Sequence, residues 1–344
     1  STQAKTLFPY TTLFRSLLDI VANITSAFAD FNIDIVMVSD QEHHGHSPYV
    51  SLIESGRVDA LIVMDVLDDD PRINYLQSRG HKFLSFGRSN TTTAPYAWID
   101  FDCESGSRQA VRYLLERGHR KIAFLGGNDE RAFVSQRKDG FMKEMSAAGI
   151  TVPEHYVLQF ARNRRSGLAA MRQILTYDDR PTALLVDSSM LADGAIMAAE
   201  QVGLIAGEDI SFITYDGLPP DTLSDKHMTS VQLSTSEKKS KQIADMTLAL
   251  IQGEKPENLH VLYSCLDLVL FLTCSCAGLR ASTPRPAPPA SYFECDPAIP
   301  KRQSFPPRTD RSHRKNPPGS WRPSQAISQG LNALPERKGT LSNR

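Results

Sequence analysis

Short apolar runs alternate with helical patterns along most of this chain, and this alternation constrains the fold more than any other feature. A continuous apolar run is typical of a strand that is buried on both faces, and residues 60–64 (ALIVM) and 183–186 (ALLV) are of this kind. Between such runs, apolar residues recur at the three- to four-residue spacing of a helix. Strands that alternate with helices predict parallel sheets joined by right-handed crossovers.

The predicted elements share this periodicity. Strands are expected at residues 33–38, 60–64, 82–86, 121–125, 183–186, 211–214 and, in part, 268–270. Helices are expected at residues 17–31, 49–55, 72–79, 104–117, 137–148, 166–175, 190–202 and 237–251. Gly56, Gly80 and Gly118 are expected to end three of the helices, because glycine adopts the left-handed conformation at little cost. Ser166 is expected to cap the helix that it begins.

The 344-residue length exceeds that of a usual single domain. Each half of the chain holds about as many strands as one doubly wound sheet. We therefore expect an α/β fold of two doubly wound parallel-sheet lobes with a ligand cleft between them. Ligands in such folds bind beyond the carboxyl ends of the strands, so the functional side chains should lie in loops that follow strands.

The two ends of the chain differ from its body. Residues 279–344 carry 12 Lys or Arg against 4 Asp or Glu and hold 12 of the 21 prolines, although the whole chain has a net charge of only −1. This stretch reads either as an out-of-frame translation or as a basic tail that touches nucleic acid. Under both interpretations we expect no packed structure over residues 271–344, because their apolar residues are too sparse to offset the entropy of ordering.

At the other end, residues 6–16 (TLFPYTTLFRS) resemble the translation of a common sequencing adapter. The alternative interpretation is an apolar strand. We expect residues 1–16 to be artefactual and unstructured, with the first strand of the domain missing or replaced.

Composition excludes several classes of protein. The net charge gives no sign of a nucleic-acid or membrane surface. No apolar run reaches the roughly 18 residues of a membrane span, and no secretory signal opens the chain. The five cysteines lack zinc-finger or redox-motif spacing. These features predict a cytoplasmic protein without a membrane partner.

Motifs for catalysis and for metal binding are also missing from the sequence. No G-x-G-x-x-G follows the first strand, no phosphate-binding loop occurs, and no Ser, His and Asp stand in a recognisable context, so neither an enzyme nor a cofactor is expected. His43, His44 and His46 lack a fourth ligand at regular spacing, so no metal site is expected. The three aspartates of residues 68–70, before Pro71, predict a turn and a helix N-terminus.

Five segments carry a resemblance to a known family. They are FGR at 86–88, the run WIDFDCESGSRQAVRYLLERGHRKIAFLGG at 98–127, SQRKDGF at 135–141, GEDISFITYDG at 207–217, and MTSVQLSTSEKKSKQIADMTLALIQGE at 228–254. Together they resemble the effector-binding core of LacI/GalR-family transcription regulators, which is periplasmic-binding-protein-like, over residues 17 to about 270. The resemblance implies an N-terminal lobe from residues 17–101 plus 233–262 and a C-terminal lobe from 102–232 plus 263–270.

The same resemblance implies a set of residues that bind the effector. Arg88, Arg137 and Asp216 stand at matching positions and suit a neutral sugar, whose hydroxyls need guanidinium donors and carboxylate acceptors. A structural ion pair between Arg137 and Asp216 is the alternative. Ser135 is either a cleft hydroxyl or part of a turn, and Trp98 either stacks on a sugar or belongs to the core or its rim.

Three further positions are weighed in the same way. Arg162 is a candidate at the cleft edge, whereas the charge run to which it belongs, with Arg164 and Arg165, is expected to be solvated. Ser188 is a candidate too, but Ser188 and Ser189 replace the Asn-Asp usual in the family, which puts an amide contact to the ligand in doubt. Asp102 is expected to cap the helix at 104 rather than to touch ligand.

The resemblance implies a regulator core that senses a small sugar, with α-glucosides as the suggested class, and that forms a homodimer through N-terminal-lobe helices at 49–55 and 72–79. No helix-turn-helix pattern precedes Leu17, so we expect operator DNA to be bound only by the intact parent protein. A periplasmic sugar-binding protein of a transporter is the alternative function.

Overall fold

The structure is a computed structural model. It describes residues 12–29, 31, 33–38, 48–89, 94–219, 221–222, 227–233, 236–265, 267–270 and 274. His43, His44 and His46, and the expected tail apart from Cys274, lie outside the described residues.

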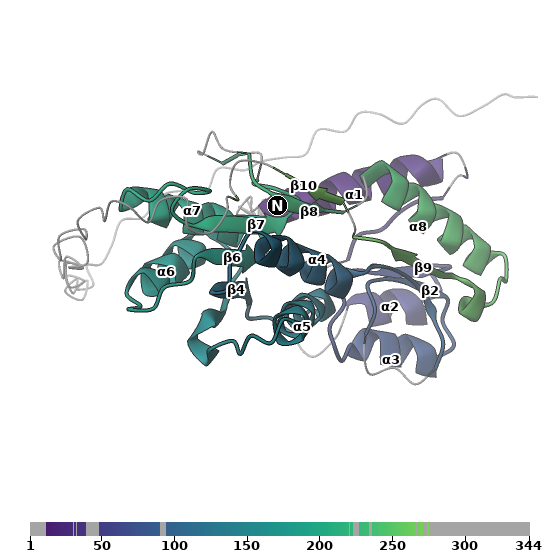
Figure 1. Ribbon diagram of the computed structural model, residues 1–344. Coiled ribbons are helices and arrows are strands. Elements are labelled where there is room, and N and C mark those ends of the chain that lie inside the picture. Colours follow the sequence, from purple (N-terminus) through teal and green to yellow (C-terminus); the bar gives the residue numbers. More distant parts are fainter. Residues whose placement is uncertain are drawn as a thin grey trace, which may run out of the picture. The chain divides into compact units, whose positions relative to one another are not determined.

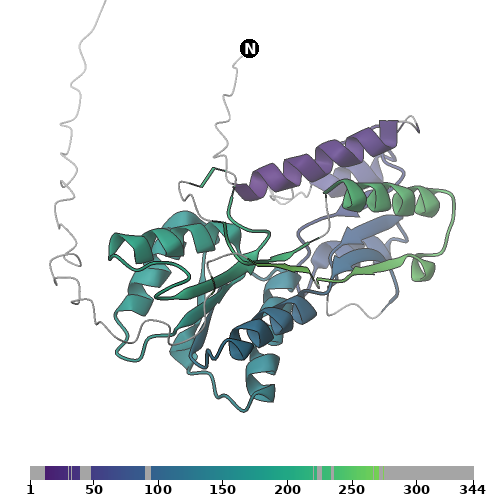
Figure 2. The same cartoon turned by 45° about the horizontal axis from the view of Figure 1, so that its top comes forward.

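The first sheet has four parallel strands in the order β1-β2-β3-β9 (Figure 1). Its strands are β1 (Leu61–Val63), β2 (Phe83–Phe86), β3 (Ala97–Phe101) and β9 (His260–Tyr263). One face is covered by α1 (Thr12–Ala29) and α8 (Ser236–Ile251), which lie side by side (Figure 2). The other face is covered by α2 (Pro48–Glu54) and α3 (Pro71–Ser78). We call this sheet and its four helices the first lobe.

The second sheet has six strands in the order β10-β8-β7-β6-β4-β5. They are β4 (Ile122–Gly127), β5 (Val157–Phe160), β6 (Ala183–Val186), β7 (Ser211–Tyr215), β8 (Ser230–Gln232) and β10 (Asp267–Val269). The helices α4 (Cys103–Glu116) and α5 (Ala132–Ala147) pack on one face, and α6 (Arg164–Leu175) and α7 (Ser189–Gln201) on the other. We call this group the second lobe. Two short 3-10 turns, Glu154–Tyr156 and Pro256–Asn258, complete the described elements.

The expected α/β fold of two doubly wound lobes is confirmed, with one exception to parallel pairing: the edge strand β10 runs antiparallel to β8. Over the described residues the chain passes between the sheets three times, from β3 to α4, from β8 to α8 and from β9 to β10. The exact lobe boundaries given above stay a prediction.

Close helix packing in the second lobe depends on glycines. A Cβ atom added at Gly194 of α7 would lie 2.0 Å from the Arg164 carbonyl oxygen, and one at Gly167 of α6 would lie 2.1 Å from the Leu191 oxygen. Real Cβ atoms do not come so near to backbone, so each glycine admits the backbone of the other helix. Both helices are therefore held at short range, and the buried face of each packs on the sheet.

Several expectations about elements are wrong. The segment 33–38 forms no strand, and its side chains at Val36 and Met37 are 62% and 58% exposed. No described strand pairs with it, so its backbone lacks the ladder that stabilises an extended chain. The helix α1 starts at Thr12, inside the segment expected to be unstructured up to residue 16. Extending a helix adds one hydrogen bond for each residue fixed, so a helix that forms further along can run back over these residues.

Other differences concern helix ends and short strands. The helix α5 begins at Ala132 rather than at 137, because the Ala132 amide donates to the Val66 carbonyl oxygen of the other lobe at 2.9 Å. Asn163, not Ser166, caps α6, and its side chain accepts from the Ser166 amide at 2.9 Å. The strands β3, β5, β8 and β9 were not expected. Cys274, in the stretch expected to be unpacked, is half-buried against the second-lobe core.

The glycine stops at residues 56, 80 and 118 are confirmed, since each has a positive φ. No helix in the described part of the chain is long and apolar enough to cross a membrane.

Candidate functional site

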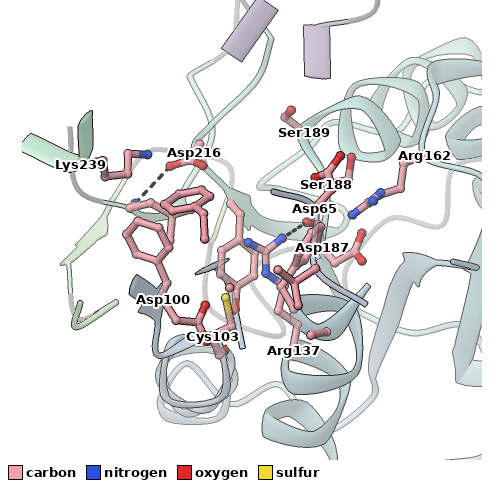
Figure 3. Close-up of a pocket in the computed structure, with 18 of the residues that line it drawn as sticks. Asp65, Asp100, Cys103, Arg137, Arg162, Asp187, Ser188, Ser189, Asp216 and Lys239 are labelled. Carbon is pink, nitrogen blue, oxygen red and sulfur yellow. Dashed lines mark hydrogen bonds between the residues drawn. The ribbon is translucent and has the colours of Figure 1, made fainter. Parts of the chain in front are cut away.

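A cavity of about 340 Å³ lies where the two lobes meet, at the carboxyl ends of β2, β3, β6 and β7. First-lobe residues on its wall are Asp65, Val66, Phe86, Gly87, Arg88, Ile99, Asp100 and Phe101, with Leu233 and Lys239 from the return segment. Second-lobe residues are Cys103, Ala132, Phe133, Arg137, Arg162, Asp187, Ser188, Ser189, Met190, Tyr215, Asp216, Leu218 and Pro219. Figure 3 shows Asp216 and Lys239 on one side of the cavity, Arg162, Asp187 and Ser188 on the other, and Arg137 between them.

Arg137 is the central cation of this site. It lies on α5 and is only 7% exposed, and its guanidinium stacks 3.6 Å from the Tyr215 ring centroid and 4.6 Å from that of Phe133. One terminal nitrogen donates to the Asp187 carbonyl oxygen, while Nε has no hydrogen-bond partner in the described protein. Two aromatic faces thus hold the planar cation in one orientation.

Asp187 stands directly after β6 and is 1% exposed. Its Oδ2 accepts a hydrogen bond from the Gly127 amide at 2.8 Å, but Oδ1 has no hydrogen-bond partner among the described residues. Burial raises the pKa of Asp187, and the nearby guanidiniums of Arg137 and Arg162 oppose that rise. Burying a carboxylate oxygen without a hydrogen-bond partner costs free energy. A ligand that donates a hydrogen bond to Asp187 Oδ1 would therefore bind favourably here.

Arg162 lies on the same side of the cavity as Asp187, with its side chain 5% exposed. It lies 3.0 Å from the Asp129 carboxylate and 4.6 Å from the Phe133 ring centroid. Its Nε has no partner in the described protein, and burial lowers the pKa of Arg162. The group therefore offers a donor toward the cavity.

Asp216 and Lys239 meet at the other end of the cavity. Asp216 follows β7 with φ 56°, and its Oδ1 accepts from the Leu233 amide at 3.1 Å. Lys239, from α8, has its Nζ 5.2 Å from the Phe101 ring centroid. Burial lowers the pKa of Lys239, and the Asp216 carboxylate counteracts this. The end of the cavity thus offers both an acceptor and a donor.

Arg88 and Asp100 pair on the first lobe. Arg88 Nε donates to Asp100 Oδ2 at 2.8 Å, and the guanidinium lies 4.9 Å from the Trp98 ring centroid. Burial raises the pKa of Asp100, whereas the Arg88 hydrogen bond lowers it. Arg88 is one-third exposed, which leaves part of its guanidinium available.

Five of the seven predicted site residues line the cavity. These are Arg88, Arg137, Arg162, Ser188 and Asp216. No ion pair joins Arg137 to Asp216 within the described ranges, so the structural alternative for these two is not observed.

Trp98 does not line the cavity, and of the two alternatives given for it the position at the rim of the core matches the structure. It stacks instead on His260, with ring centroids 4.9 Å apart, and lines a separate shallow pocket. Trp98 shares a strand face with Asp100, but two residues place it about 7 Å further from the strand end.

Ser135 does not line the cavity either. Its hydroxyl oxygen lies 2.9 Å from both Asp68 Oδ1 and the Ala132 carbonyl oxygen, which share its one proton. Two positions along a helix turn a side chain by about 200°, so Ser135 and Arg137 face nearly opposite ways.

Ser135 belongs to a contact between the lobes that we call the clasp, made by residues 65–68 against residues 130–135. The Asp68 amide donates to the Glu130 oxygen and the Ala132 amide to the Val66 oxygen, each at 2.9 Å. Leu67 and Arg131 form an antiparallel bridge. The clasp closes the cavity on one side.

Two turn predictions are confirmed and one charge prediction is wrong. Asp102 caps α4 by accepting from the Ser105 amide at 3.0 Å, and Asp70 caps α3 by accepting from the Arg72 amide at 3.0 Å. Arg164 is not merely solvated, since it pairs with the buried Asp193 and, at 2.7 Å, with Asp221.

The described residues contain no group of three His, Cys, Asp or Glu able to hold a metal ion.

Sequence reasoning missed Asp187, Asp100 and Lys239. Asp187 carries a usable signal, because it is the first residue after a fully apolar strand. Lys239 carries none, because it comes from the middle of a helix pattern and reaches the cavity only through tertiary packing.

The amino-acid sequence matches a known protein family over most of its length. The family model described as "Periplasmic binding proteins and sugar binding domain of LacI family" matches residues 9–267. The chain belongs to the LacI family. It is 35% identical over 248 residues to the HTH-type transcriptional regulator RafR of Escherichia coli, covering 72% of this chain and 73% of that protein.

Two solved structures have a similar fold and sequence. A transcriptional regulator from Yersinia pestis biovar Microtus has a TM-score of 0.70 and 36% identity, covering 72% of this chain and 89% of that one. A lac repressor dimer bound to operator and the anti-inducer ONPF has a TM-score of 0.67 and 26% identity, covering 77% and 91%. These relatives are transcriptional regulators, which favours a regulator over a transporter's binding protein.

Proposed function

We propose that the cavity binds a small sugar as the effector of a transcriptional regulator, and that it senses this ligand rather than transforming it. The supporting observation is Asp187, a carboxylate buried between Arg137 and Arg162 with one oxygen unpartnered in the described protein. A sugar hydroxyl donates and accepts at once, so adjacent hydroxyls can satisfy the carboxylate and a guanidinium together.

The rest of the wall supports the same ligand class. Phe86, Phe101, Phe133 and Tyr215 offer apolar ring surface beside the charged groups, which suits the apolar face of a pyranose. The volume lies at the lower end of the range for small-molecule sites. We propose that Arg88, Arg162, Ser188 and Asp216 complete the contacts, and that α-glucosides are the first class to test.

The test is titration calorimetry of the full chain against a panel of mono- and disaccharides that includes α-glucosides. Saturable heat with one member is expected, and Asp187→Asn should weaken that binding roughly 10- to 100-fold, since a hydrogen bond to a charged group contributes about 1.5–3 kcal/mol. The matched control is Asp179→Asn, an exposed aspartate paired with Lys121. No heat from any sugar with folded protein would refute the ligand class, and equal losses in both variants would refute the role of Asp187.

We further propose that the chain forms a homodimer through α2 and α3 and that the intact regulator binds operator DNA in the cytoplasm. Support comes from the lac repressor neighbour, which is a dimer on its operator. Ser51 on α2 is exposed, so Ser51→Asp should split a dimer without unfolding the lobe. Sedimentation should show a monomer for this variant and a dimer for Ser146→Asp, the same change on exposed α5. A monomeric wild type would contradict the proposal.

A further inference from the structure

Two of the three crossings between the lobes carry a cysteine. Cys103 is the first residue of α4, just after β3, and Cys265 follows β9. The crossings lie side by side, because the Asp102 amide donates to the Tyr263 carbonyl oxygen at 2.9 Å. Both cysteines are reduced and buried, at 2% and 0% exposed.

The two thiols touch each other. They share a side-chain hydrogen bond and belong to one packed cluster. Gly106, in the first turn of α4, makes room for this contact, since a Cβ atom there would lie 2.9 Å from the Cβ of Cys265. The sulfurs are therefore neighbours although the residues lie far apart in the sequence.

The surroundings make the two thiols unequal. Cys103 lines the cavity and sits at a helix N-terminus beside Arg137 (Figure 3). The hydrogen bond from Cys265 lowers the pKa of Cys103, as does the charge of Arg137, whereas that same bond and burial raise the pKa of Cys265. Low pKa and access to small molecules are the conditions for a reactive thiol. Cys265 does not line the cavity and lies in position to resolve an oxidised Cys103.

We propose that Cys103 and Cys265 form a peroxide-sensitive disulfide switch that links two adjacent crossings at the hinge between the lobes. A hydroperoxide enters the cavity, and the Cys103 thiolate attacks its terminal oxygen. The O–O bond breaks, Cys103 becomes a sulfenic acid, and the leaving oxygen takes a proton to become water or an alcohol. The Cys265 sulfur then attacks the sulfenic sulfur, its proton leaves with the hydroxyl group as water, and an S–S bond forms. Two thiols are oxidised and one peroxide is reduced.

A disulfide here would add a covalent bond between two crossings that are otherwise held together by a backbone hydrogen bond and side-chain packing. The cross-link therefore acts on lobe motion, which is the movement by which two-lobed proteins couple a ligand to a response. Formation of the disulfide needs no sugar, so its test is independent of the test for the proposed effector.

The test uses the full chain, reduced and then treated with hydrogen peroxide, followed by peptide mapping without reduction. The expected product is a Cys103–Cys265 cross-linked peptide, lighter by two hydrogens than its separate halves. In C265S, Cys103 should stop at the sulfenic acid and be trapped by dimedone. In C274S, a cysteine outside the hinge, the cross-link should form as in the wild type.

Thiol labelling supplies a second measurement that needs no variant. In the folded wild type, N-ethylmaleimide should modify Cys103 at least about tenfold faster than Cys265. A map in which neither hinge cysteine changes, or in which Cys103 pairs with a cysteine other than Cys265, would overturn the proposal. Faster labelling of Cys265 than of Cys103 would overturn the assigned roles.

Discussion

Ser135 of the second lobe donates a hydrogen bond to the Asp68 carboxylate of the first lobe at 2.9 Å. It is one of two side-chain contacts in the clasp, since Arg131 also pairs with Asp65 at 3.4 Å, and the other bonds run between backbone groups. The lobes are thus joined on one side of the cavity by groups that belong to no common element. A contact of this kind can break when the lobes open without disturbing either sheet.

Ser135→Ala should loosen the clasp. Loss of one hydrogen bond costs about 1 kcal/mol, so amide exchange at Asp68 and Ala132 should quicken roughly fivefold. Hydrogen exchange with mass spectrometry measures this, with Ser146→Ala on the exposed face of α5 as control. Unchanged protection in the Ser135 variant would show that the backbone bonds and the Arg131–Asp65 pair hold the clasp without the Ser135 hydroxyl.

Arg137→Lys should weaken effector binding although it keeps the positive charge. Lysine lacks the planar group that stacks between Tyr215 and Phe133 and donates along fixed directions. Affinity for whichever sugar binds the wild type should fall at least about tenfold. Arg165→Lys, a change at an exposed arginine, should leave it unaltered. Full retention of affinity in Arg137→Lys would mean that charge alone is recognised.

Gly194→Ala should destabilise the second lobe, because its new methyl group would meet the Arg164 carbonyl oxygen at 2.0 Å. Forced backbone separation of this kind costs about 1–3 kcal/mol or more. Urea unfolding followed by circular dichroism gives the free energy. Ala169→Ser, which adds one atom on exposed α6, is the comparison and should change little. Similar stability for both variants would contradict the tight packing of α6 and α7.

Glu144 predicts a pH dependence of stability. Burial tends to raise the pKa of its carboxyl, but hydrogen bonds from Arg112 and Arg108, at 2.9 and 3.0 Å, bring it below the ordinary 4.5. A carboxyl with a lowered folded-state pKa stabilises the protein above its unfolded pKa, and this contribution is lost as the pH falls through the folded value.

Glu144→Gln should therefore lower the unfolding free energy by about 1 kcal/mol at pH 7 and make progressively less difference below about pH 4.5. Urea unfolding at several pH values measures the loss of unfolding free energy at pH 7 and its decrease in acid. The exposed Glu257→Gln is the reference variant. A Glu144→Gln penalty that persists undiminished in acid would assign the effect to packing rather than to charge.

The fold was predictable where local pattern and tertiary context agree. The apolar strand β6 matched its predicted range because a strand buried on both faces has no polar residues to blur its ends. The short strands β8 (SVQ) and β9 (HVLY) were missed, since each contains polar residues, has no long apolar run, and pairs with neighbours distant in the sequence. The start of α5 was missed for the same reason, because a carbonyl of the other lobe satisfies its first amide.

Most of the candidate-site residues that were predicted follow strands, and Arg137, which lies in α5, was predicted from the family resemblance. Arg88 and Asp216 follow β2 and β7 and reach the cavity. Ser135 and Trp98 were expected there, but helix rotation and strand depth direct them elsewhere. The direction of a side chain on a helix and its distance from the end of a strand change within one or two residues. A sequence motif alone does not resolve such differences.

The position of β9 has a consequence for how the chain is made. This strand completes the first sheet beside β3, yet 158 residues separate Phe101 from His260, and the whole parallel part of the second sheet lies between them. During synthesis, the N-terminal sheet stays open at that edge until nearly all of the described chain has left the ribosome. The second sheet can mature first, so the lobe that is begun earlier is finished later, and a nascent chain stalled before His260 would present β3 as a bare edge for unwanted pairing.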